Sequence, residues 1–131
     1  MKRLFYPAVF HKAEEGGYWI TFPNFPDTFT EGDTLEECYS MAVDALGLTL
    51  ADLIEAKAPL PTPFAIEDIP NEKDAYPVMI EFDYFAYRKK HNGRAVKKTL
   101  SIPQWLNEEA LALGLNFSQV LQEALLAKID Q

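Results

Sequence analysis

The chain has 131 residues, and its 12 basic and 20 acidic residues give it a net charge of −8. Nearly half of the residues are apolar and 17 are aromatic, which excludes a disordered acidic tail and allows one compact domain or two small ones. The apolar runs are too short to cross a bilayer and the single cysteine excludes an intrachain disulfide, so we expect a cytoplasmic protein with no membrane partner.

The charge is unevenly distributed along the sequence. Residues 1–87 hold 5 basic and 16 acidic residues, a balance of −11, whereas residues 88–131 hold 7 and 4, a balance of +3. Six lysines and arginines fall between Arg88 and Lys98 without one acid. A cationic segment favours nucleic acid as a partner, and an anionic one favours a basic protein. We therefore predict an N-terminal domain over 1–87 and a C-terminal domain, with its hinge, over 88–131.

The first residues predict a hairpin followed by a short strand. Leu4–Lys12 and Tyr18–Phe22 are rich in aromatic and β-branched residues, and the loop between them contains two glycines. The prolines of Pro23–Asp27 each lack a ladder donor, so this segment cannot continue a central strand. Thr28–Thr30 is expected to form a short third strand.

A helix and a fourth strand complete the predicted N-terminal domain. Thr34 and Glu37 have the spacing of a capping box, which predicts a helix that runs to near Ala58. An extended loop follows, and Pro77–Phe85 alternates like a strand with one wetter face. The expected order is β-β-β-α-β, one sheet with a helix packed on it, in an α+β protein. Tyr87–Gly93 is expected to be the hinge to the second domain.

The C-terminal residues predict one strand and two short helices. Apolar and polar residues alternate across Ala95–Ile102, and one face of this strand has no large apolar side chain. Gln104–Leu113 carries an apolar stripe, and Gly114 follows as a C-terminal stop. Asn116 is a preferred N-cap for the second helix.

This C-terminal unit is too small to bury its apolar surface alone, and a lone strand leaves two unpaired edges. Both problems disappear if two chains pair their strands antiparallel, in a homodimer or in a larger assembly such as a tetramer. The paired ribbon would present Lys97, Thr99 and Ser101 of each chain, and such a ribbon fits the major groove of DNA. The residues expected at the phosphates are Arg94, Lys97, Lys98, Asn116, Phe117 and Ser118. The alternative is a small helical appendage with solvated lysines.

Two parts of the chain resemble known families. The strand, Ile102-Pro103, the first helix, Gly114–Ser118 and the second helix resemble the ribbon–helix–helix DNA-binding family. The first half contains Tyr6-Pro7-Ala8, Gly17-Tyr18-Trp19, Phe22-Pro23-Asn24-Phe25-Pro26 and Gly32-Asp33-Thr34-Leu35-Glu36-Glu37. In these residues it is similar to the HicB family of antitoxins. Lys97–Asn107 also resembles the tail found in one branch of that family.

The resemblance implies a non-enzymatic antitoxin that neutralises a HicA-like toxin, a small basic RNA-cleaving protein, and that represses its own operon by binding operator DNA. It also implies an N-terminal domain similar to a shortened ribonuclease-H-like fold. Two positions depart from the family pattern: Asp27-Thr28 replaces a glycine and a small residue, and Cys38 replaces an alanine. We expect no cofactor and no metal. Carried over by position, the DNA-reading residues are Lys97, Thr99 and Ser101, with Asn116, Phe117 and Ser118 at the phosphate.

The resemblance does not locate the surface that would bind the toxin. Exposed acids around an apolar anchor give affinity and fast association with a basic protein. Each acid has the alternative of an ordinary solvated charge, and Trp19 has the alternative of a packing role. The residues expected at this surface are Glu14, Glu15, Asp33 and Glu36, with Trp19 and Phe25 as the anchors.

Two other functions stay open on the residues alone. A metal-dependent nuclease of the ribonuclease-H type needs several converging carboxylates. Glu81 and Asp83 share one face of a predicted strand, but no acid in the first two strands completes a cluster. The other alternative is a stand-alone transcriptional regulator whose acidic domain senses a small ligand or another partner. A neighbouring gene for a smaller basic protein would favour the toxin pairing over this regulator.

Overall fold

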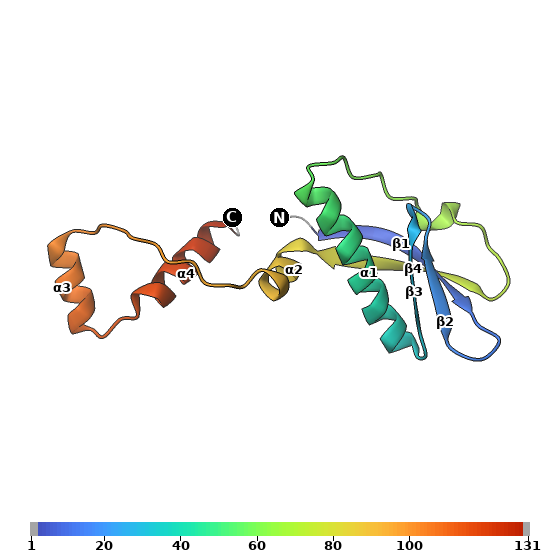
Figure 1. Cartoon of the computed structure of the whole chain (residues 1–131), viewed down its shortest axis with the longest axis horizontal. Helices are drawn as coiled ribbons and strands as arrows, with labels where there is room; N and C mark the ends of the chain where they lie inside the picture. Colours follow the sequence, from blue (N-terminus) through green and yellow to red (C-terminus); the bar gives the residue numbers. More distant parts are fainter. Residues whose placement is uncertain (1–2, 130–131) are drawn as a thin grey trace. The chain divides into compact units, whose positions relative to one another are not determined.

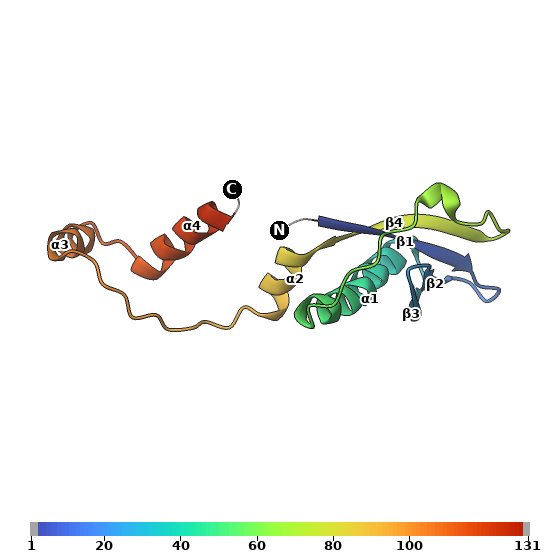
Figure 2. The same cartoon turned by 90° about the horizontal axis from the view of Figure 1, so that it is seen from above.

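The computed structural model describes residues 3–129 (Figures 1 and 2). The chain divides into two compact units, Met1–Gly93 and Arg94–Gln131. The order of elements in the first unit confirms the predicted β-β-β-α-β arrangement. The elements are, in chain order, β1 (Arg3–Lys12), β2 (Tyr18–Phe22), β3 (Phe25–Gly32), α1 (Leu35–Glu55), the 3-10 turn η1 (Ile66–Asp68), β4 (Ala75–Asp83), α2 (Tyr84–His91), α3 (Gln104–Ala112) and α4 (Phe117–Ile129).

The first unit is built on one antiparallel sheet with the strand order β3-β2-β1-β4. The predicted hairpin is confirmed as β1 and β2. The third strand is longer than the predicted Thr28–Thr30, because β3 already begins at Phe25 and includes Pro26. A proline fits there because β3 lies at the edge of the sheet, where an absent N–H interrupts no second ladder. Pro77 is accommodated in the same way in β4, the opposite edge strand.

Helix α1 covers one face of this sheet and closes the core (Figure 1). Its predicted N-cap is confirmed, because the backbone N–H of Glu37 donates to Thr34 Oγ1 at 3.1 Å. The helix ends at Glu55, before the predicted Ala58, because Lys57 takes a positive φ of 56°. The core side chains that the sheet and α1 bury together are Tyr6, Ala8, Phe10, Ile20, Phe22, Phe25, Cys38, Ala42, Leu46, Leu50, Ala51, Ile80, Phe82 and Tyr84.

The proline-rich connection between α1 and β4 is held to the sheet by hydrogen bonds. Tyr6 Oη donates to the carbonyl oxygen of Pro61 at 2.6 Å. Asn24 bridges the turn between β2 and β3 to the same connection, since its Nδ2 donates to Thr62 O at 2.9 Å and its Oδ1 accepts from Phe64 N at 3.2 Å. The chain then forms η1 on the side of β1 and β4 opposite α1 (Figure 2). The predicted surface loop is therefore attached to the first unit by these three hydrogen bonds.

The segment after β4 differs from the prediction. Tyr87–Gly93 was expected to be a hinge, but α2 continues to His91, and the predicted boundary at residue 87 falls inside this helix. Asp83 caps α2, because its Oδ1 accepts the backbone N–H of Ala86 at 3.1 Å. The ring of Tyr87 packs against Phe82 with 5.6 Å between centroids. Capping and aromatic packing together explain why the segment is helical.

The second unit contains α3 and α4, joined by a tight turn at Gly114. The N–H of Leu115 donates to Ala110 O at 3.2 Å, and the N–H of Gly114 donates to Leu111 O at 3.0 Å. This pair of bonds is a Schellman motif, and Gly114 supplies the left-handed φ of 69° that the motif requires. Within residues 3–129 no single helix is long and apolar enough to cross a membrane. Helices α3 and α4 reach that length and composition only together, and they meet at 109°.

The predicted strand Ala95–Ile102 is not formed in the single chain. Residues 93–103 have neither helix nor strand. The physical reason is that a ladder needs the N–H and C=O groups of a neighbouring strand, and the described part of the second unit has no other strand to supply them.

A pair of adjacent glycines tests how tightly the sheet sets the β1–β2 loop. A Cβ on Gly17 would lie 2.5 Å from Gly32 O, whereas a Cβ on Gly16 would meet nothing within 4 Å, and both residues have positive φ. We expect Gly17→Ala to lower the free energy of unfolding by about 2–4 kcal/mol and Gly16→Ala by only about 1 kcal/mol. Urea denaturation measures both values, and equal losses would show that the close approach to Gly32 is unimportant.

Candidate functional site

The polar residues predicted to read DNA all lie exposed on the extended segment that precedes α3. The predicted cations on this segment are likewise exposed and are close together in sequence. Because the segment has no strand partner among residues 3–129, its N–H and C=O groups are available to another strand. The exposed residues are Arg94, Lys97, Lys98, Thr99 and Ser101.

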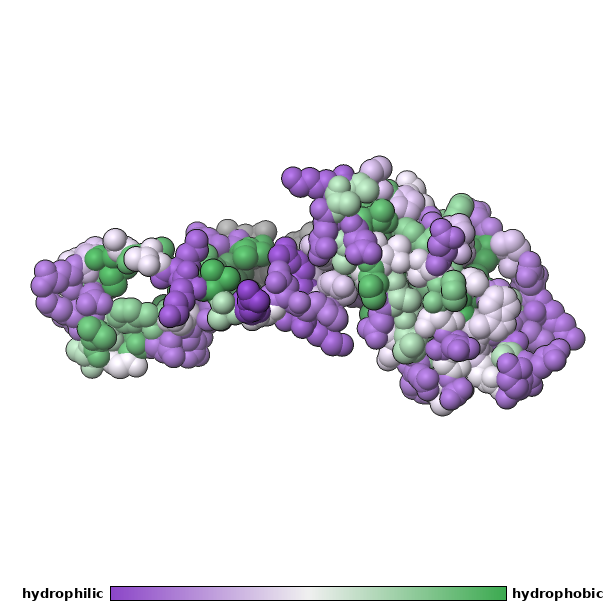
Figure 3. Space-filling model, in the orientation of Figure 1, coloured by the Kyte–Doolittle hydropathy of each residue, from purple (hydrophilic) through white to green (hydrophobic). Residues whose placement is uncertain are grey.

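The second unit does not bury its apolar side chains. Between residues 94 and 129 the structure has no fully buried residue, and Val96 and Leu113 are 82% and 75% exposed. Figure 3 shows apolar residues (green) on the surface of the second unit. An exposed surface of this kind marks a site that another apolar surface covers. The large apolar residues exposed in this unit are Val96, Leu100, Ile102, Trp105, Leu106, Leu111, Leu113, Leu115, Phe117, Val120, Leu125, Leu126 and Ile129.

The start of α4 has the predicted capping geometry. Asn116 Oδ1 accepts the backbone N–H of Gln119 at 3.1 Å, which confirms Asn116 as the N-cap. The first amides of a helix have no intrahelical acceptor, and the helix dipole adds positive potential at the same place. Phe117 and Ser118 are exposed at this end of α4. The start of α4 therefore has the chemistry to hold a phosphate, as the prediction requires.

The acids predicted to bind a basic partner gather at one end of the first unit. The pairing of Tyr18 with Gly32 brings the β1–β2 loop against the turn between β3 and α1. The register of two neighbouring strands thus places two sequence-distant acidic segments side by side. The exposed acids here include the predicted Glu14, Glu15, Asp33 and Glu36, and Glu37 is also exposed on the first turn of α1.

Of the two predicted aromatic anchors, only Trp19 lies on the surface. Its side chain is 48% exposed and stacks on the ring of His11, with 3.7 Å between centroids. The prediction for Phe25 is wrong, because this residue is 8% exposed and packs on Tyr6 in the core at 5.1 Å between centroids. Phe25 begins β3 with its side chain toward α1, and a strand expected to start only at Thr28 gave no basis for assigning that direction.

The sequence reasoning missed an exposed aromatic residue beside Trp19. Phe29 is 75% exposed and pairs across the sheet with Thr21, which lies on the same sheet face as Trp19. Both aromatic side chains therefore lie on the sheet face opposite α1. The alternation within β3 could have revealed Phe29 if the strand had been assigned its full length.

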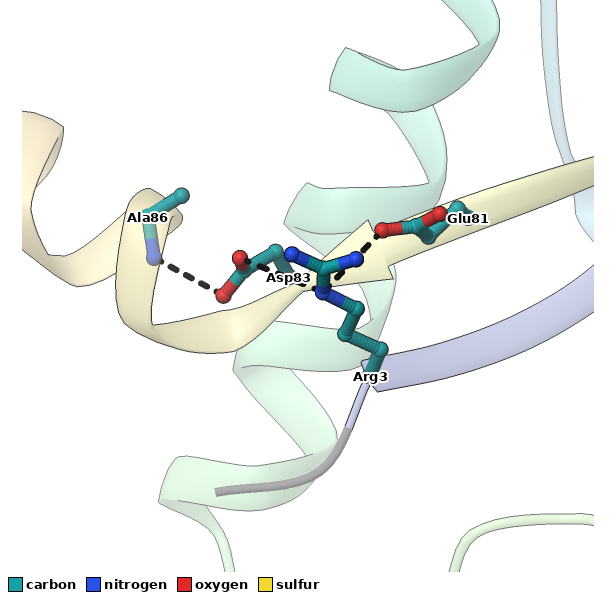
Figure 4. Close-up of polar contacts among 4 residues, drawn as sticks. All are labelled: Arg3, Glu81, Asp83 and Ala86. Carbon is teal, nitrogen blue, oxygen red and sulfur yellow. Dashed lines mark hydrogen bonds and ion pairs between the residues drawn. The ribbon is translucent and has the colours of Figure 1, made fainter. Parts of the chain in front are cut away.

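The two strand carboxylates considered for a nuclease are engaged in structural contacts (Figure 4). Arg3 Nε lies 3.3 Å from Glu81 Oε1 and 3.8 Å from Asp83 Oδ2. Asp83 also caps α2 through Ala86. Within residues 3–129 no group of three His, Cys, Asp or Glu side chains could hold a metal ion. The geometry thus offers these carboxylates a role in joining β1 to the β4–α2 junction.

The pKa values of the buried Cys38 and of the half-buried His11 are both shifted from their ordinary values. Burial raises the pKa of the Cys38 thiol, and the neighbouring Glu37 carboxylate raises it further. Burial also lowers the pKa of His11, whose Nε2 lies 2.9 Å from Thr21 Oγ1. A buried thiol with a raised pKa is a poor nucleophile because little of it is thiolate near neutral pH.

Comparison with known proteins gives the family of this chain. Residues 6–110 match the family model described as the HicB_like antitoxin of bacterial toxin-antitoxin systems. The chain belongs to the HicB-like antitoxin family. This family is not known for enzymatic activity.

Relatives of this HicB-like chain include antitoxin HicB 1 of Photorhabdus laumondii, which is 43% identical over 65 residues. The match covers 48% of this chain and 42% of the relative, so less than half of that protein's length is spanned. Antitoxin HicB of Escherichia coli K12 is 38% identical over 66 residues, covering 48% of this chain and 47% of the relative.

Solved structures resemble this HicB-like chain over most of its length. A chain of the toxin-antitoxin complex from Streptococcus pneumoniae is 30% identical, with a TM-score of 0.62, and the match covers 97% of this chain and 99% of that one. A chain of a HicA3 and HicB3 toxin-antitoxin complex is 26% identical, with a TM-score of 0.50, over 61% of this chain and 99% of that one. The four-stranded sheet with its helices is therefore an arrangement found in HicB structures.

The buried thiol gives a test of the core of this HicB-like domain. The thiolate is the reacting form, and the raised pKa keeps Cys38 protonated at pH values where an unfolded thiol, with a pKa near 8.5, begins to ionise. We expect a thiol reagent at pH 8 to label native Cys38 far more slowly than the urea-unfolded chain. A matched control carries Cys38→Ala with Ser40→Cys, which moves the thiol to an exposed position on the same helix.

The linkage between this thiol and folding also has a defined sign. Because the thiol pKa is raised in the folded state, the thiol's contribution to the free energy of unfolding depends on pH. This contribution is complete below the unfolded pKa of about 8.5 and is lost as the pH rises through the folded pKa.

Rapid labelling of native Cys38, at the rate of the Ser40→Cys control, would contradict its burial.

Proposed function

We propose that this chain neutralises a HicA-like, mRNA-cleaving toxin and represses its own operon by binding operator DNA as a homodimer in the cytoplasm. Membership of the antitoxin family supports the first activity. One observation carries the second: residues 94–129 contain no fully buried side chain, although they include two helices and an exposed segment rich in apolar residues. The second unit therefore needs a partner surface, and a second copy supplies one of matching chemistry.

Pairing of two copies would satisfy both needs of the C-terminal unit. Two antiparallel copies of 95–102 would give each other the ladder bonds that a single chain lacks. Val96, Leu100 and Ile102 would then face the apolar stripes of α3 and α4, as in a ribbon–helix–helix dimer. The same pairing would turn Lys97, Thr99 and Ser101 of both chains outward as one ribbon. A charge-bearing hydrophilic ribbon of this size suits the DNA major groove.

Operator binding can be tested with Lys97→Ala. Removing Lys97 from both chains of a dimer removes two base or phosphate contacts, so we expect specific binding to weaken by about tenfold or more and its salt dependence to flatten. The measurement is fluorescence anisotropy with a duplex from the region upstream of the gene, at several salt concentrations. Lys128→Ala is the matched control, because it removes one exposed lysine from the last turn of α4. Unchanged binding of Lys97→Ala at every salt concentration would overturn the ribbon assignment.

The acidic end of the first unit supports the toxin half of the proposal. Glu14, Glu15, Asp33 and Glu36 would attract a basic protein, and Trp19 on the neighbouring strand would supply an apolar contact. Electrostatic attraction of this kind speeds association, while a desolvated aromatic contact slows dissociation. The complexes formed by related chains with a toxin make a protein of that kind the expected partner.

Charge reversal tests this surface. We expect Glu14→Lys with Glu15→Lys to slow association with the basic protein encoded beside the gene by about tenfold at low salt, and less at high salt. Surface plasmon resonance measures the rates, and co-expression measures growth rescue. The control is Glu67→Lys with Asp68→Lys, an equal charge change on η1. If the control slows association as much as the loop variant, the loop is not the docking site. The absence of any neighbouring basic protein would instead favour a stand-alone regulator.

A further inference from the structure

Helix α2 is fixed rigidly to the first unit. A Cβ on Gly47 of α1 would lie 2.9 Å from the ring of Phe82 and 3.4 Å from the ring of Tyr87, so α1 approaches α2 and β4 as closely as a glycine allows. The rings of Phe82 and Tyr84 pack with 6.2 Å between centroids, and Asp83 caps the helix. The orientation of α2 on the sheet is therefore set by its buried side.

The other side of α2 carries positive charge. Lys89 and Lys90 are exposed, and Arg88 is also exposed while its guanidinium lies 5.7 Å from the ring centre of Tyr84. Within the described residues, no carboxylate lies within ion-pair distance of these three cations, whereas Arg3 of the same unit has two. The basic residues of the last turn complement the helix dipole, but three adjacent cations also repel one another. The cluster of Arg88, Lys89 and Lys90 can therefore bind an external anion.

The position of α2 in the chain limits where that anion can be. Lys90 lies four positions before Arg94 and seven positions before Lys97, so the backbone keeps Lys90 within about 25 Å of Lys97. This distance is shorter than one turn of B-DNA, about 34 Å. If Lys97 lies on an operator, the length of the backbone keeps α2 within reach of the flanking phosphates.

We propose that Lys89 and Lys90, with Arg88 beside them, contact the phosphate backbone of the duplex that flanks the operator. This inference rests on the proposed function, because it requires the second unit to bind DNA. It adds a sequence-independent contact from the N-terminal unit, which the ribbon does not contain. Lysine suits this role because it binds phosphate as a point charge without a fixed hydrogen-bond geometry.

Electrostatics explains why such a contact belongs at this end of the N-terminal unit. Residues 1–93 hold 8 basic and 16 acidic residues, so the unit as a whole is repelled by DNA. Strand β1 runs from Arg3, which pairs with Asp83 next to α2, to Lys12 at the loop end, a distance of about 30 Å at 3.3 Å per residue. The acidic loop with Glu14 and Glu15 is thus far from α2. The cations of α2 reduce the repulsion from DNA at the end of the unit that is joined to the DNA-binding segment.

The test compares two double variants of the full chain that lose equal charge. Lys89→Ala with Lys90→Ala removes the proposed contacts. Lys12→Ala with Lys73→Ala removes two exposed lysines at the opposite end of the sheet, because Lys12 ends β1 and Lys73 lies in the turn before β4. The probe is a duplex from upstream of the gene. It contains the region that the parent protein protects in hydroxyl-radical footprinting and the base pairs that flank this region on both sides. Affinity is measured by fluorescence anisotropy between 50 and 200 mM salt, a range of about fourfold.

We expect the slope of log affinity against log salt to fall by about 2–4 per dimer for Lys89→Ala with Lys90→Ala, and by less than about 1 for the control. Preference for the operator over a scrambled duplex should stay unchanged, because phosphate contacts carry no sequence information. Trimming about 5 base pairs, half a helical turn, from each flank should weaken the parent to the level of this variant and leave the variant unaffected. Circular dichroism of each variant is the control that checks whether its helix content equals that of the parent protein.

Failure of this inference is distinguishable from failure of the proposed function. If the parent protein binds the upstream duplex specifically but both double variants show the same slope and the same response to trimming, the α2 contact is overturned and the ribbon stands. If the parent shows no preference for that duplex over the scrambled one, operator binding is overturned and the flanking contact with it.

Discussion

A folded chain has to bury its apolar side chains against something, and the two units of this protein meet that constraint in opposite ways. The first unit hides its aromatic and aliphatic side chains between one sheet and α1. The second unit is left with Val96, Trp105, Leu113 and other apolar residues facing solvent. Burial of one Leu-sized or Val-sized side chain contributes about 1.5–3 kcal/mol, so a surface of this extent strongly favours association. The ladder bonds that 95–102 lacks point to the same conclusion.

Local signals in the sequence predicted most of the fold of the first unit. The Thr34 cap, the hairpin and the alternation of β4 depend on neighbouring residues, and all three are confirmed. The errors have two different causes. Helix α2 has a local start signal, because Asp83 caps it through Ala86 and Tyr87 packs on the nearby Phe82, so its cap could have been read from the sequence. Strand β3 includes Pro26 because it lies at the edge of the sheet, and the residues of the segment itself do not state that position.

The candidate surfaces were predictable to different degrees. The alternation of 95–102 predicts Lys97, Thr99 and Ser101 on one face of a strand, whereas in the single chain both faces of this segment are exposed and the strand is not formed. The gathering of Glu14, Glu15 and Asp33 at one end of the sheet comes from the β2–β3 register, which the sequence does not state. Phe25 was misplaced and Phe29 was missed because the side on which an aromatic residue falls depends on where the strand begins.

On the proposed function, the unburied surface of the C-terminal unit has a consequence for gene control. If folding of that unit and pairing of two chains are one event, the amount of operator-competent species at low concentration rises with the square of the monomer concentration. Halving the cellular level of the protein would then leave about a quarter of the repressor, by mass action alone. The first unit has its own core, so its folding does not depend on the concentration of a second chain. A fall in protein level would therefore relieve repression sooner than it would release the toxin.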